Sequence, residues 1–183
     1  MEIDWQLVLT DHGPAVWRKV RALLGNDADA RDCYQNVFLE ALKCSQKYGI
    51  EDWGAFLGRI ARVRSLDVLR RRYRSNLRID ADTTTDQVIS RLPTADETLQ
   101  ANELSERLRV AIASLSPQQA ETFLMRYIEH LTYDEIAQRT GSNRNAVGVI
   151  LNRAKQQLRA LLGNPSEHEN TPTVTPHSNQ EPS

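Results

Sequence analysis

Residues 131–159 read LTYDEIAQRTGSNRNAVGVILNRAKQQLR, and this stretch predicts a short helix, a tight turn and a longer basic helix. Thr132 and Glu135 form the pattern of a capping box, in which the hydroxyl and the carboxylate each accept from a free backbone N–H. Gly141 suits the sharp turn after the first helix, and Asn143 is a favourable N-cap for the second. Helices joined in this way have the geometry that places the second one in the major groove of DNA.

The predicted second helix has two different faces. Its apolar stripe consists of Val147, Leu151, Ala154, Leu158 and Leu161. Another face, at the N-terminal half, consists of Arg144, Asn145, Gly148 and Asn152. Because Arg and Asn can make paired hydrogen bonds to base edges, this face favours DNA recognition. The alternative is a pair of amphipathic helices that merely pack together.

Charge is distributed unevenly along the chain, although the net charge is only −1. Residues 57–78 hold eight arginines and one acid, whereas residues 79–97 hold five acids and one base. Such segregation indicates an anionic partner at one place on the molecule rather than a uniformly basic protein.

Apolar residues recur at helical spacing along the rest of the chain and predict an all-α protein. We expect a first helix that is interrupted near Pro14 and ends at Gly25, a second that begins near Asp27, and a third over 53–73. Ser116, with Pro117 after it and Gln119 three residues on, predicts a further helix start.

Several classes of protein are disfavoured. Cys33 and Cys44 would lie about 16 Å apart on one helix, too far for a disulfide, so we expect free thiols in a reducing cytosol. No apolar run reaches the length of a membrane span, and the N-terminus lacks the character of a signal peptide. The four histidines are scattered, and no metal-ligand cluster, phosphate-binding glycine loop or nucleophile elbow is present. We therefore expect a soluble cytoplasmic protein that is not an enzyme and needs no cofactor or metal.

Three segments together resemble one known family. They are DADARDCYQNVFLEAL (27–42), WGAFLGRIARVRSLDVLRRRYR (53–74) and LSPQQAETFLMRYIEHLTYDEIAQRTGSNRNAVGVILNRAKQQLR (115–159). In this order they are similar to regions two and four of the extracytoplasmic-function (ECF) group of sigma-70 family RNA polymerase sigma factors. The resemblance covers roughly residues 5–162.

The resemblance implies two small helical domains joined by a flexible linker. A three-helix region-two domain would occupy 1–75, and an acidic linker with Thr83, Thr84 and Thr85 would occupy 76–97. A region-four domain with a helix-turn-helix or winged-helix-like DNA-binding unit would occupy 98–163. The polar, proline-bearing residues 164–183 predict a disordered end.

The resemblance also implies partners and the residues that bind them. The RNA polymerase core would be bound by Asp32, Gln35, Asn36 and Glu40. Promoter DNA would be bound by Trp53, Arg59, Arg62, Arg64, Arg70, Arg71, Arg74, Arg144, Asn145, Asn152, Arg153 and Lys155. Region four would read the duplex upstream box (the −35 element), while the 46–52 loop and the start of the third helix would receive single-stranded bases of the downstream box (the −10 element). An anti-sigma protein is a further candidate partner.

Two residues depart from the family pattern. Val63 stands where members commonly carry an asparagine, and Gly148 stands at a position often occupied by a basic residue. Both changes affect the promoter sequence that could be read rather than the architecture. Two other hypotheses stay open: a helix-turn-helix regulator that never joins the polymerase, which would leave the arginine-rich helix unexplained, and an adaptor that binds the polymerase without initiating transcription.

Overall fold

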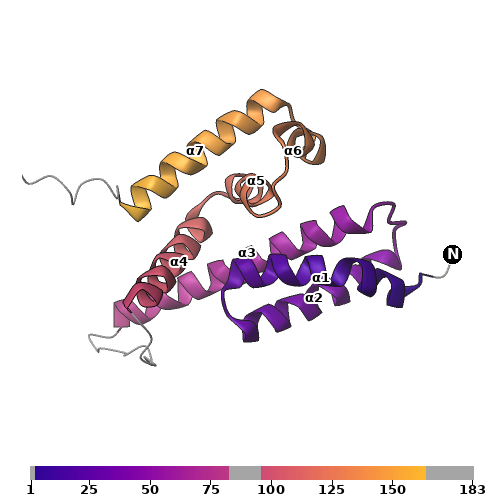
Figure 1. The fold of residues 1–183 in the computed structure, drawn as a ribbon, viewed down its shortest axis with the longest axis horizontal. Helices are drawn as coiled ribbons and strands as arrows, with labels where there is room; N and C mark the ends of the chain where they lie inside the picture. Colours follow the sequence, from indigo (N-terminus) through magenta and orange to yellow (C-terminus); the bar gives the residue numbers. More distant parts are fainter. Residues whose placement is uncertain (1–2, 83–95, 164–183) are drawn as a thin grey trace, which may run out of the picture.

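The computed structural model describes residues 3–82 and 96–163, with side chains over 3–75 and 101–163. These residues form helices only, which confirms the predicted all-α class (Figure 1). The helices are α1 (Trp5–Leu24), α2 (Asp27–Ser45), α3 (Trp53–Asp82), α4 (Asp96–Ser114), α5 (Pro117–Tyr127), α6 (Tyr133–Thr140) and α7 (Arg144–Leu162). The predicted region-four unit is thus a helix-turn-helix, and none of the described residues forms the strands of a wing.

Local capping begins three helices, α5, α6 and α7, at the predicted residues. Ser116 and Thr132 each form a complete capping box, with Gln119 and Glu135 respectively. Asn143 accepts from the backbone N–H of Ala146 at 2.9 Å and begins α7. Each of these contacts satisfies a backbone N–H that has no partner within the helix.

Two predictions about helix boundaries were wrong. The first helix was expected to break near Pro14, yet α1 runs unbroken through it. Val8 and Val16, on either side of the proline, are both buried in one core, so packing keeps the helix continuous. The third helix was expected to end near Tyr73 but reaches Asp82, because no glycine or proline interrupts the sequence over that distance.

Helices α1, α2 and α3 pack into a three-helix bundle around Val20, Val37 and Leu57. Cys33 is buried in this core and Cys44 is partly buried, and both thiols are free, as predicted. Burial raises the pKa of the Cys33 thiol.

The second helical unit packs around two smaller cores. Ile112, Leu124 and Leu158 join α4, α5 and α7, while Ile136 and Val147 join α6 to α7. The unit does not stand apart from the first bundle, since α4 and α5 both contact α3 (Figure 1). The cores also cross the boundary: Ala113 of α4 lies in the core of the first bundle, and Leu23 and Leu66 lie in the core of the second unit. Residues 83–95, most of the predicted linker, and the predicted disordered end at 164–183 lie outside the described residues.

Candidate nucleic-acid interface

The helix-turn-helix presents the N-terminal end of α7 to solvent. Arg144 is the first residue of this helix and is about two-thirds exposed. Its Nη1 donates to Asp134 Oδ2 of α6 at 2.7 Å. Because an exposed ion pair contributes little stability, Arg144 can exchange Asp134 for a phosphate or a base edge.

Four of the five residues predicted to read DNA from α7 lie on its outer surface. Besides Arg144, the exposed side chains are Asn145, Asn152 and Arg153. Lys155 differs, since it is only partly exposed and its ammonium lies 5.5 Å from the centroid of the Tyr127 ring of α5. This cation–π contact holds Lys155 at the flank of the helix.

Two further residues belong to this outer face and were not singled out from the sequence. Val149 is 50% exposed, and Gln156 is also exposed. They follow Asn145 and Asn152 by one helical turn each, so helical spacing alone could have identified them. An exposed apolar side chain on a major-groove face can contact the methyl group of thymine. Gly148 lies beside α6, since a Cβ at this position would be 3.7 Å from the Tyr133 ring.

The arginines of α3 that were predicted to bind DNA fall into two groups. Arg59, Arg71 and Arg74 are exposed and able to approach a nucleic-acid backbone. The remaining three, Arg62, Arg64 and Arg70, contact other parts of the protein. Arg70 Nη2 donates to the carbonyl of Leu115 at 3.3 Å. Arg64 Nε donates to Glu40 Oε2 at 2.7 Å, and this hydrogen bond raises the pKa of Arg64. The structure thus pairs two residues predicted to have different partners, Glu40 with the polymerase and Arg64 with DNA.

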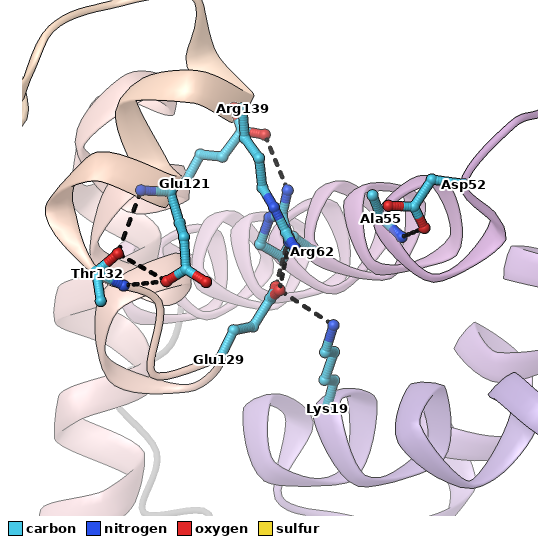
Figure 2. Close-up of polar contacts among 9 residues, drawn as sticks. Lys19, Asp52, Ala55, Arg62, Glu121, Glu129, Thr132 and Arg139 are labelled. Carbon is cyan, nitrogen blue, oxygen red and sulfur yellow. Dashed lines mark hydrogen bonds and ion pairs between the residues drawn. The ribbon is translucent and has the colours of Figure 1, made fainter.

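Arg62 is the only arginine of the predicted DNA-binding set that is buried among the described side chains. Its Nη1 lies 2.5 Å from Glu129 Oε1, and its Nη2 lies 3.6 Å from Glu121 Oε1. Figure 2 shows Lys19 and Arg139 converging with Arg62 on the same carboxylate of Glu129. In this arrangement Arg62 faces the second helical unit rather than solvent.

Trp53 lies at the start of α3 within an aromatic cluster. Its ring meets Trp5 edge-on at 5.3 Å and Phe56 at 6.2 Å between centroids. Asp52 fixes this end of the helix by accepting from the backbone N–H of Ala55 at 2.8 Å. The partly exposed Trp53 forms one wall of a hollow of about 650 Å³, bordered also by Tyr48, which is 70% exposed. A hollow with aromatic walls can accept an unstacked base.

The predicted polymerase-binding residues lie along one face of α2. Asp32, Gln35 and Asn36 are exposed, and the Glu40 side chain is 35% exposed beside Arg64. Shallow hollows of about 320 and 400 Å³ between α2 and α3 flank this face, and Asn36 borders both. An exposed row of acids and amides suits a polar interface that forms and separates.

The described residues lack two kinds of feature, a metal site and a membrane span. They contain no group of three or more His, Cys, Asp or Glu side chains placed to hold a metal ion. Among their helices, none has both the length and the apolar character required to cross a membrane.

Two family models match the chain. The model described as "Sigma-70 region 2" matches residues 8–75, and the one described as "Sigma-70, region 4" matches residues 105–158. The first therefore covers α1, α2 and most of α3, and the second covers the helix-turn-helix with the helices before it.

Relatives agree with these matches. The chain is 30% identical over 160 residues to the ECF RNA polymerase sigma factor SigE of Mycolicibacterium smegmatis, covering 87% of this chain and 62% of the relative. It is 29% identical over 154 residues to the ECF RNA polymerase sigma factor BldN of Streptomyces coelicolor, covering 82% of this chain and 57% of the relative. The chain thus spans about three-fifths of the length of these curated relatives.

A solved structure shares the fold. It is the sigma factor RpoE in complex with the anti-sigma factor NepR from Bartonella quintana, with a TM-score of 0.50 and 21% sequence identity. The match covers 87% of this chain and 96% of that chain.

Proposed function

The chain belongs to the ECF group of the sigma-70 family, and on that premise we propose that it is a sigma factor, which directs bacterial RNA polymerase to specific promoters and initiates transcription there. The observation that carries the proposal is the presence on one chain of both a region-two bundle with an exposed polar face and a region-four helix-turn-helix. A stand-alone DNA-binding regulator would need only the second of these.

Region two would bind the polymerase core through α2. Asp32, Gln35 and Asn36 are exposed in a row on that helix and are therefore available to a partner. Glu40 would contribute from its position beside Arg64 at the edge of the same face.

Region four would bind the duplex upstream box with α7 in the major groove. Arg144, Asn145 and Asn152 would meet base edges, each paired contact giving about 1–3 kcal/mol of discrimination. Arg153 and Lys155 would neutralise phosphates, and each neutralised phosphate would steepen the salt dependence of binding by about 0.9 in log–log slope.

The downstream box would be bound as a single strand beside α3. The hollow next to Trp53 would receive an unstacked base, and the exposed Arg59, Arg71 and Arg74 would contact the backbone. Arg62, Arg64 and Arg70 belong to the same proposed surface but would first have to leave their partners within the protein.

The sigma-factor proposal also bears on the chemistry, the location and one further partner of the protein. The polymerase would carry out the chemistry, so the factor itself would need no cofactor and would not be an enzyme. It would act in the cytoplasm, where the polymerase is. An anti-sigma protein is proposed as a further partner, because the solved relative is in complex with one.

The test is binding of the full chain to RNA polymerase core, with the housekeeping sigma factor as competitor. We expect competitive binding that Asp32→Lys weakens at least about tenfold, equivalent to about 1.4 kcal/mol. Glu103→Lys is the control, because Glu103 is an exposed acid on α4, away from the proposed face. Binding of duplex DNA without any binding to the polymerase would contradict the proposal and leave a stand-alone regulator.

A further inference from the structure

The side chain of Glu129 joins the two domains at a buried point. It lies in the turn between α5 and α6 and is only 4% exposed. Its carboxylate meets Lys19 Nζ at 3.1 Å, Arg62 Nη1 at 2.5 Å and Arg139 Nη1 at 3.7 Å (Figure 2). Lys19 and Arg62 belong to region two, whereas Glu129 and Arg139 belong to region four. The contact therefore connects two parts of the chain that are far apart in sequence.

The backbone around Glu129 is held in an uncommon conformation. His130, the next residue, has φ = 57° and is the one non-glycine with positive φ among the described residues. Backbone hydrogen bonds close the turn on both sides, from Glu129 N to the carbonyl of Leu124 at 3.2 Å and from Leu131 N to that of Met125 at 3.0 Å. Such a conformation persists where the surrounding structure fixes it. Here the turn presents Glu129 to the two cations of region two.

Other polar contacts cross the same boundary. Arg70 of α3 donates to the carbonyl of Leu115 at 3.3 Å, and Arg109 of α4 donates from Nε to the carbonyl of Leu23 at 3.0 Å. With Arg62, the docked region four therefore occupies two of the arginines proposed to bind DNA. In the closed arrangement Arg62 is buried and cannot reach DNA, and Arg70 would have to release the Leu115 carbonyl to bind DNA with its Nη2.

The distance between promoter boxes also conflicts with this closed arrangement. Boxes centred near −35 and −10 are separated by about 25 base pairs, or about 85 Å at 3.4 Å per pair. In the structure, Lys19 of region two and Arg139 of region four contact the same carboxylate. The two domains must therefore move apart before both boxes can be read.

We propose that Glu129 is an intramolecular latch, which holds region four over the arginines of region two and keeps the free factor closed to DNA. The latch rests on the proposed function, whose regulation it describes. A carboxylate buried among cations is stable only while they surround it, because a buried charge without a partner is strongly unfavourable. On opening, Lys19 and Arg62 would lose this carboxylate and could contact a DNA phosphate in its place.

The test compares the full chain with Glu129→Gln, which keeps the shape of the side chain and removes its charge. We expect the variant to have a larger radius of gyration by small-angle X-ray scattering. We also expect it to bind a promoter duplex at least about tenfold more tightly without polymerase. Glu103→Gln removes the same charge from the exposed face of α4 and should match the wild type in both measurements.

A folded Glu129→Gln protein that is as compact as the wild type and binds DNA no better would overturn the latch. If this variant does not fold, Lys19→Gln decides the question, since it removes a partly exposed cation from the same carboxylate. Wild-type binding to polymerase core is measured in parallel. If the wild type does not bind core polymerase, the sigma-factor assignment is rejected. The latch is tested separately, by the radius of gyration of the free protein and by its affinity for DNA.

Discussion

Glu135 stabilises the first turn of α6 through Thr132. Its Oε2 accepts from the backbone N–H and from the hydroxyl of Thr132, both at 2.7 Å. These hydrogen bonds, the one to the backbone foremost, lower the pKa of Glu135 from its ordinary value of 4.5. A carboxyl with a lowered pKa in the folded state stabilises the protein fully above its unfolded pKa. That stabilisation is lost as the pH falls through the lower, folded value.

We therefore expect the free-energy difference between the wild type and Glu135→Gln to narrow as the pH falls below about 4.5. Glutamine keeps an acceptor for the cap but has no charge to lose. Urea unfolding of both proteins at a series of pH values measures this difference. A difference that stays constant from pH 6 to pH 3 would contradict the role given to the Glu135 charge.

At the scale of the helix, α1 and α6 both end at a glycine with a left-handed backbone. Gly25 has φ = 75° and Gly141 has φ = 63°. Their surroundings differ: a Cβ on Gly141 would meet nothing within 4 Å, whereas one on Gly25 would lie 2.2 Å from the guanidinium carbon of Arg109. Arg109 could move away only by giving up its hydrogen bond to Leu23.

We expect Gly141→Ala to lower the free energy of unfolding by about 1–2 kcal/mol, the penalty for a left-handed backbone with a Cβ. Gly25→Ala should lower it by about 1 kcal/mol more, because the Arg109 hydrogen bond is lost as well. Chemical denaturation of the two variants gives both values. Equal losses would show that Arg109 contributes nothing to the end of α1.

The helices were predictable where local residues define their ends. Ser116, Thr132 and Asn143 are caps whose partners lie three residues away, so the sequence alone identifies them. Pro14 misled the prediction because burial of the residues around it, a non-local effect, keeps α1 continuous. The predicted end of α3 near Tyr73 is wrong because the basic and polar residues that follow contain nothing that stops a helix.

The candidate site was likewise predictable where local helical spacing decides which side chains are exposed. Exposure of Arg144, Asn145 and Asn152 follows from the apolar stripe opposite them on α7. The burial of Arg62 could not be foreseen, because its partner Glu129 lies 67 residues further along the chain. Periodicity describes which face of a helix is polar, but it does not say which other helix covers that face.

At the scale of the whole molecule, the two domains share apolar cores as well as ions. Leu23, Leu66 and Ala113 are each no more than 6% exposed, and each lies in the core formed mainly by the other domain. Separating the domains would expose these side chains to water, which is unfavourable in proportion to the apolar area uncovered. The closed form is therefore favoured by packing as well as by charge.

Because of this shared packing, the factor must reach a threshold concentration before it binds an appreciable share of the polymerase. If polymerase accepts only separated domains, the apparent dissociation constant equals the intrinsic one divided by the fraction of molecules that are open. A mostly closed population must then accumulate before it can displace a competitor from a limited pool of polymerase. In a titration of core polymerase, Glu129→Gln should reach half-saturation at a lower concentration than the wild type, and identical midpoints would argue against such a threshold. The same contacts that keep the arginines covered would then set how much factor a cell must make before its promoters respond.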